Sequence, residues 1–242
     1  MHLNLRVLIC VLLATPAAQA VRVEGFATGV IAELAETDTN GEQVFGLDGP
    51  GLLGQAFRID FAYDPALAPP DTQPAGDRGV YESVGGTAWL ELAISVNGLS
   101  EELTGDRRYS DVMDDALGGS EDSIQLAIEL FSLTTAGGVE QRRRTFLDFL
   151  VAMPADTFAG DALPESLTTD QIIRIFNSAT FRINDWDRVT ATNEFTYTRY
   201  VAFNLDIQEI SAAPVPEPGS AALLGVGLAV LAGRAAVRAR SR

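Results

Sequence analysis

Hydrophobic and polar residues alternate over most of the middle of the chain. In residues 57–63, Phe57, Ile59 and Phe61 are separated by charged or small residues. This period of two is typical of a β-strand with one face on a core and the other in water. The same period recurs in three further segments, at residues 90–97, 124–130 and 195–207. Shorter candidate strands cover residues 26–35, 44–47, 146–151 and 180–183.

Glycine-rich turn sequences separate these candidate strands. Asn40–Gly41 and Asn97–Gly98 are the strongest hairpin signals, because Asn and Gly accept the positive φ angles of a tight turn. Residues 66–79 contain several prolines and predict a long loop. Only residues 168–176 resemble a helical turn, and their branched residues suit a strand equally well. The pattern predicts an all-β domain, an antiparallel β-sandwich or jelly roll.

The amino end has the form of a secretory signal peptide. Arg6 precedes an apolar stretch from Val7 to Ala14, and Ala18 and Ala20 form the small-x-small site that signal peptidase cleaves. We therefore expect residues 1–20 to be removed after Ala20. The mature chain would begin outside the inner membrane.

The carboxyl end has three parts in a fixed order. A proline-rich stretch comes first and consists of Val215, Pro216, Glu217 and Pro218. An apolar run from 221 to 233 follows, and as a helix it covers about 20 Å of a hydrocarbon layer of about 30 Å. A basic end then acts as a membrane stop, with arginines at Arg234, Arg238 and Arg240. These arginines should stay cytoplasmic, which places the body outside the inner membrane.

This tail resembles the PEP-CTERM sorting signal of exported bacterial proteins. The resemblance implies that Pro216, Glu217 and Pro218 are recognised by an exosortase, an integral-membrane protease. It also implies a precursor tethered to the inner membrane and a product at the cell surface or in an exopolysaccharide matrix. The expected domains are a signal peptide (1–20), a β-sandwich body (21–210), a linker with the motif (211–220) and a membrane helix with a basic end (221–242).

The amino-acid composition limits which partners and which kinds of catalytic site the body can have. The net charge is −16, and all of the basic residues are arginines. This negative field disfavours nucleic acid as a partner. The single histidine, His2, and the single cysteine, Cys10, lie in the signal peptide, so the mature chain lacks the residues of catalytic triads, Schiff bases and zinc sites. We therefore expect a structural or binding module without a cofactor, and not an enzyme.

Two alternatives remain open at this point. A polysaccharide-degrading hydrolase or lyase needs only two suitably spaced carboxylates. The candidates are Asp111, Asp114, Asp115, Glu121 and Asp122. A calcium-stabilised adhesin is the other alternative, because Glu36, Asp38, Asn40 and Gly41 match the first half of an EF-hand loop. Leu47 stands where the final bidentate glutamate belongs, which favours a simple Asn-Gly hairpin.

Two tryptophans are candidate ligand residues for a polysaccharide. Trp89 shares its parity with the polar residues Glu91 and Ser95, which predicts a position on the wet face of a strand. Trp186 lies in a polar stretch, and an exposed ring beside polar groups is a platform for a sugar. The run Arg142 to Arg144 is interpreted as the end of a strand in water, or as a charged strand edge that discourages pairing.

Overall fold

The computed structural model describes residues 22–38, 43–73, 78–103, 105–115, 121–155, 157, 160, 162–167 and 178–215. Four predicted features lie outside these residues: the signal peptide, the Asn40–Gly41 turn, the helical turn and the tail from Pro216. No helix within the described part of the chain is long and apolar enough to cross a membrane.

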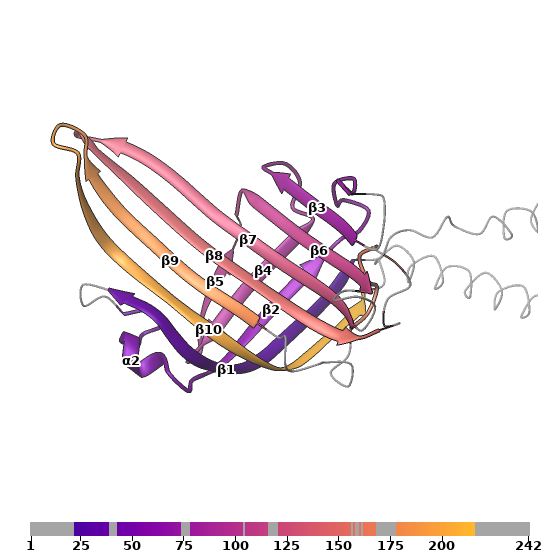
Figure 1. Ribbon diagram of the computed structural model, residues 1–242. Coiled ribbons are helices and arrows are strands. Elements are labelled where there is room, and N and C mark those ends of the chain that lie inside the picture. Colours follow the sequence, from indigo (N-terminus) through magenta and orange to yellow (C-terminus); the bar gives the residue numbers. More distant parts are fainter. Residues whose placement is uncertain are drawn as a thin grey trace, which may run out of the picture.

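Strands make up most of the described chain (Figure 1). They are β1 (Val23–Asp38), β2 (Ala56–Tyr63), β3 (Arg78–Val84), β4 (Leu90–Val96), β5 (Leu99–Leu103), β6 (Arg107–Asp115), β7 (Glu121–Ala136), β8 (Val139–Pro154), β9 (Ser178–Val189) and β10 (Glu194–Pro214). One short helix, α2 (Gly49–Leu52), is capped by the side chain of Asp48, which accepts a hydrogen bond from the Gly51 amide.

The strands form one ten-stranded sheet in the order β3-β6-β7-β8-β9-β10-β1-β2-β4-β5. Every neighbouring pair is antiparallel, which confirms the predicted all-β, antiparallel class. The two layers expected of a sandwich are parts of this single continuous sheet.

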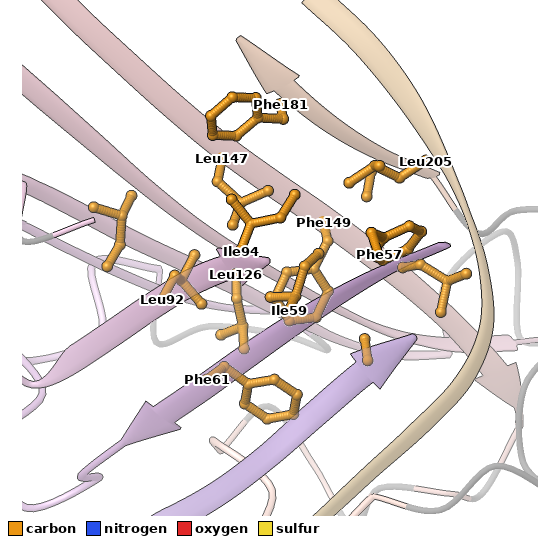
Figure 2. Packing of buried hydrophobic residues seen from close by; sticks show 14 of the residues in the cluster. Phe57, Ile59, Phe61, Leu92, Ile94, Leu126, Leu147, Phe149, Phe181 and Leu205 are labelled. Carbon is orange, nitrogen blue, oxygen red and sulfur yellow. The ribbon is translucent and has the colours of Figure 1, made fainter. Parts of the chain in front are cut away.

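The sheet folds over so that its β2–β4 part faces its β7–β8 part across the core (Figure 2). Phe61 of β2 and Phe149 of β8 meet with ring centroids 5.4 Å apart, although their strands are not neighbours in the sheet. The alternation predicted for residues 57–63 is confirmed, because Phe57, Ile59 and Phe61 are buried in this core. Burial of these apolar faces supplies the main force that holds the fold together.

Two tight hairpins are built from residues with positive φ. Asn97 (φ 52) and Gly98 (φ 74) connect β4 to β5, which confirms the hairpin predicted there. Gly137 (φ 59) and Gly138 (φ 81) connect β7 to β8 in the same way. Positive φ at both central positions is the requirement of the type I′ turn, whose twist matches that of the strands.

Strands β7 to β10 project beyond the rest of the molecule as an arm (Figure 1). On one side, the ladder with β6 ends at the pair Arg107 and Glu129. On the other side, the ladder with β1 ends at the pair Asp38 and Tyr200. We call the part beyond these pairs the arm; it comprises residues 130–145 and 182–199.

The last strand is longer than the sequence predicts. β10 continues to Pro214 and pairs with the start of β1, so the sheet extends four residues into the expected linker of 211–220. Ile210 and Ala212 are buried and alternate with less buried neighbours, which gives this end the pattern of a half-buried strand. The body therefore ends beside the proline motif.

Candidate binding surface on the arm

The outer face of the arm carries aromatic and charged side chains side by side. Across β8 and β9, Arg142 stands opposite Trp186, and Arg144 stands opposite Asn184. Across β7 and β8, Phe131 stands opposite Arg144. Residues opposite one another share a face of the sheet. Most of the buried apolar residues of these strands have the other parity. We call this outer side the arm face.

Trp186 lies at the centre of the arm face. The guanidinium of Arg142 lies 4.4 Å from the centroid of the Trp186 ring, and Phe195 contacts it edge-on with centroids 5.2 Å apart. Arg188 lies over the ring of Phe195 at 5.9 Å. Cation–π and edge-to-face contacts of this kind fix the orientation of the rings. The arm therefore presents a preorganised aromatic cluster.

Carboxylates hold the arginines in place. Glu140 accepts hydrogen bonds from Arg142 Nε at 3.0 Å and from Arg188 Nη2. Burial alone would raise the pKa of Glu140, but the hydrogen bonds and charges of Arg188 and Arg142 outweigh burial, and the pKa is lowered. Arg144 donates through Nε to Glu129 at 2.6 Å. Each arginine therefore keeps further N–H donors while its charge is balanced.

A shallow hollow of about 170 Å³ opens beside Trp186. It is lined by Glu129, Phe131, Arg142, Arg144, Asn184 and Trp186. Within the described part of the chain, the Oδ1 atom of Asn184 has no hydrogen-bond partner. A buried acceptor of this kind favours a site that a ligand or water completes.

A second hollow of about 300 Å³ adjoins the first. It is lined by Arg107, Tyr109, Gln125, Ala127, Glu129 and Phe146, and the two hollows share Glu129. Ala127 has a small side chain and forms the floor of this hollow, between the aromatic rings of Tyr109 and Phe146. Both hollows lie on the outer side of β7 and β8, so they form one strip across the sheet.

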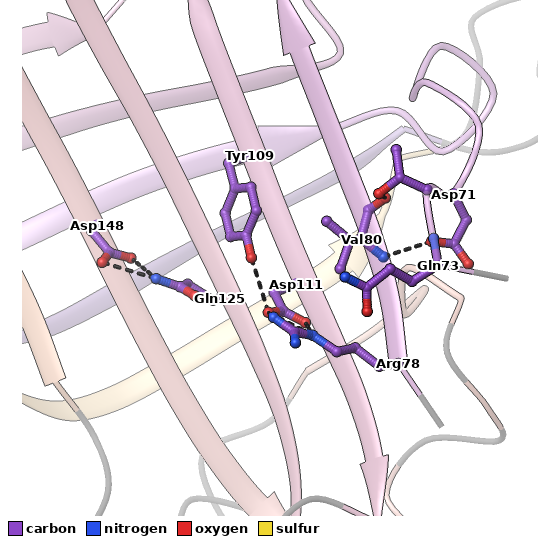
Figure 3. A network of polar contacts seen from close by, with 9 residues as sticks. Asp71, Gln73, Arg78, Val80, Tyr109, Asp111, Gln125 and Asp148 are labelled. Carbon is purple, nitrogen blue, oxygen red and sulfur yellow. Dashed lines mark hydrogen bonds and ion pairs between the residues drawn. The ribbon is translucent and has the colours of Figure 1, made fainter. Parts of the chain in front are cut away.

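A polar network borders the second hollow (Figure 3). Gln125 donates through Nε2 to both carboxylate oxygens of Asp148, at 2.8 and 2.9 Å. Burial raises the pKa of Asp148, and the hydrogen bond from Gln125 opposes this shift. Next to it, Asp111 accepts from the hydroxyl of Tyr109 at 2.9 Å and from Arg78 Nε at 2.9 Å. These bonds fix Gln125 and Tyr109 at the rim of the hollow.

Large apolar side chains remain exposed on the arm face. Phe131 is 41% exposed, Leu133 is 48% exposed and Phe195 is 54% exposed. Apolar side chains gathered on one face and surrounded by polar groups mark a surface that binds something. On the opposite face of the arm, Arg143 pairs with Asp187 at 3.0 Å.

The two tryptophan predictions have different outcomes. Trp186 lies half-buried on the arm face. Trp89 is only 2% exposed, so the prediction of a wet-face position is wrong. Trp89 precedes β4, where strand parity does not apply, and its indole N–H donates to Ser83 Oγ at 2.9 Å inside the core. Sequence reasoning also missed Phe131 and Phe195, because neither carries a motif.

Both interpretations of the arginine run, as a strand end and as a charged strand edge, are wrong. Arg142 to Arg144 lie inside β8, near its start, and β8 pairs with β7 on one side and with β9 on the other. Opposing carboxylates make this position stable for charged residues, as for Arg143 with Asp187 and Arg144 with Glu129. The run is therefore part of a salt-bridged sheet.

The structure gives less support to the predicted catalytic carboxylates and to the predicted calcium site than to the arm face. Asp111 is 2% exposed and held by Arg78 and Tyr109, so its charge is already compensated. Among the described residues, no three His, Cys, Asp or Glu side chains gather closely enough to hold a metal ion. In the EF-hand-like stretch, Glu36 and Asp38 end β1, whereas Asn40 and Gly41 lie outside the described residues.

Most of the predicted sorting residues lie outside the described chain. They are Ala18, Ala20, Pro216, Glu217, Pro218, Arg234, Arg238 and Arg240. Val215 is described, and it is exposed immediately after β10. It marks the point at which the tail leaves the body.

Comparison with known proteins identifies this tail. Residues 214–240 match the model of the PEP-CTERM protein-sorting motif. Searches of curated proteins and of solved structures found no match for the chain. The chain therefore carries a PEP-CTERM sorting motif, which marks it as an exported protein that an exosortase processes.

Proposed function

We propose that the body is a polysaccharide-binding module that holds the exported protein in the matrix or envelope around the cell. After signal-peptide removal, the precursor stays tethered to the inner membrane by its tail, and processing then delivers the body to the cell surface or beyond. The observation that carries the binding role is the arm face, with Trp186 and two adjoining hollows.

The chemistry of the arm face suits sugar rings. A sugar ring has an apolar face that stacks on aromatic side chains and hydroxyl groups that donate and accept hydrogen bonds. Trp186 and Phe131 supply rings in the first hollow, and Tyr109 and Phe146 supply rings in the second. Glu129 and the arginines supply acceptors and donors beside them. Rings and charged groups therefore alternate along the strip.

The charge of the site favours a neutral polysaccharide. Glu140 pairs with both Arg142 and Arg188, and Glu129 pairs with Arg144, so these two carboxylates balance all but one of the three arginine charges on the arm face. The whole chain carries −16, which repels a polyanion. A neutral polysaccharide is not repelled by this charge, and its hydroxyl groups can hydrogen-bond to both members of an Arg–Glu pair.

The two hollows indicate a polymer and not a single sugar. Ala127 of the second hollow and Phe131 of the first lie about 13 Å apart along β7, because each strand residue rises about 3.3 Å. One sugar ring cannot occupy both positions. A chain of several rings can, and its affinity then gains from both hollows.

Affinity gel electrophoresis of the purified protein with a neutral glucan tests the proposal. Trp186→Ala should weaken retention about fivefold or more, because one lost stacking platform is worth about 1 kcal/mol or more. Phe26→Ala is the matched control, since Phe26 also lies under an arginine, Arg58, at 4.2 Å, but far from the arm on β1. Equal loss in both variants, or retention by alginate alone, would contradict the proposal.

The rival is a carboxylate-dependent polysaccharide hydrolase or lyase. Its best candidates are Glu129, which lines both hollows, and Asp148, whose pKa is raised by burial. A raised pKa suits a general acid. Release of reducing sugar in the same assay, abolished by Glu129→Gln or Asp148→Asn, would favour this enzyme over the binding module.

A calcium-stabilised adhesin stays a prediction with its own test. Adding millimolar calcium to the purified protein should raise its melting temperature if an ion binds the folded body. The effect should then be smaller in Asp38→Ala. An unchanged melting temperature would remove this alternative.

A further inference from the structure

The end of β10 is held on both of its edges. On one edge it pairs with β1, with Pro214 opposite Val23 and Ala212 opposite Gly25. On the other edge, the amide of Ala212 donates to the carbonyl of Leu167 at 2.9 Å, and the amide of Leu167 donates back at 3.2 Å. The last strand of the body therefore has its backbone groups occupied almost to its end.

The final hydrogen bond lies one residue beyond the strand. The amide of Val215 donates to the carbonyl of Arg22 at 2.8 Å. Pro216 follows, and a proline has no N–H with which to continue the ladder. The sheet thus reaches the residue that precedes Pro216, and the match to the sorting motif begins inside β10 at Pro214.

The carbonyl of Arg22 accepts this last hydrogen bond, and the side chain of Arg22 holds the start of β1 in place. Its guanidinium donates to both carboxylate oxygens of Glu91 on β4, at 2.6 and 3.4 Å, and to Glu24 at 3.0 Å. The hydrogen bond with Glu91 is the largest cause of a raised pKa at Arg22, so the pair stays charged. The start of β1 is tied in this way to a strand two places away in the sheet.

Close packing also joins the two strand ends. A Cβ atom added to Gly25 would lie 2.5 Å from the carbonyl oxygen of Ser211 and 2.6 Å from the Cβ of Ala212. The absence of a side chain at Gly25 is therefore what lets β10 lie against β1 here. We call the paired ends, residues 22–26 and 211–215, the terminal clamp.

A protease binds its substrate as an extended strand and makes hydrogen bonds to the substrate backbone. Most of those groups in the terminal clamp are not available to a protease, because the sheet already uses them. We infer that the terminal clamp is the boundary for tail processing, and that the broken peptide bond lies after Val215. In hydrolysis, water adds to the carbonyl carbon of that bond and the amine leaves with the tail.

This boundary has a consequence for the mature protein. The new carboxyl terminus stays beside the new amino terminus, because Val215 remains bonded to Arg22. The body also reaches the processing enzyme without a spacer, since the clamp ends one residue before Pro216. The inference does not use the arm face and stands or falls separately from the polysaccharide proposal.

Intact-mass analysis of the protein newly processed in its host tests the boundary. The expected product has its carboxyl terminus at Val215 or later, with β10 complete. A main product that ends before Val215 would overturn the inference.

Limited digestion of the full-length chain in detergent gives a second test. With proteinase K, the resistant fragment should end at or just after Val215. Arg22→Ala unties the start of β1 from Glu91 without a steric clash, and should shift a larger share of fragment ends into residues 211–215. Arg107→Ala is the matched control, because Arg107 is also exposed and pairs with Glu82, which is not part of the terminal clamp. Identical fragment ends in all three proteins, or a wild-type end well inside β10, would overturn the role of the clamp.

Discussion

The contact between Phe61 and Phe149 tests whether the sheet folds over on itself. The two rings lie 5.4 Å apart, but β2 and β8 are separated in the sheet by β9, β10 and β1. The rings can therefore meet only through the core. Leucine is the better replacement, because alanine would cost about 3–5 kcal/mol at each site and a double variant could unfold.

We expect Phe61→Leu and Phe149→Leu each to lower the free energy of unfolding by about 1–2 kcal/mol, less than half the cost of alanine. The double variant should lose less than the sum, by about 0.5–1.5 kcal/mol, because the ring–ring contact is lost only once. Urea unfolding measures all four free energies, and an unchanged m-value keeps the comparison valid.

A matched pair without a contact completes this experiment. Leu133 is exposed on the arm, so Leu133→Ala and Phe149→Leu should add within about 0.5 kcal/mol. A coupling energy of zero between Phe61 and Phe149 would mean that the rings do not touch. The folded-over sheet would then be refuted.

Two further predictions concern the polar network of the outer face. Because burial raises the pKa of Asp148, the folded state holds its proton more tightly than the unfolded chain, and stability falls as the pH rises from about 4 through the raised value. Asp148→Asn should therefore raise the melting temperature at pH 7 and leave it nearly unchanged at pH 3; an equal effect at both pH values would contradict the pKa shift. Arg78→Met should lower the free energy of unfolding by roughly 1–2 kcal/mol, because Asp111 is 3% exposed but Arg78 is 46% exposed and Asp111 keeps its hydrogen bond from Tyr109. Adding Asp111→Asn should recover most of that loss in urea unfolding, and no recovery would show that the ion pair is not its cause.

The sequence alone determines the local features of this protein. The period of two in residues 57–63 and 90–97 predicts strands because it states which face of each strand is apolar. Asn97–Gly98 predicts a hairpin because these residues accept positive φ. The sorting motif can also be recognised from the sequence alone, because its residues, 214–240, are consecutive in the chain.

Only the tertiary structure decides which of these pieces meet. β1 and β10 come from opposite ends of the body, and nothing local to either strand specifies their pairing or the clamp. Trp89 and Trp186 look alike in the sequence, but the fold buries one and places the other beside Arg142 and Phe195. The alternation of hydrophobic and polar residues indicates which side chains lie on each face of one strand. A binding surface also depends on the register between neighbouring strands. That register is set by long-range burial and close packing, as at Gly25, which no short pattern encodes.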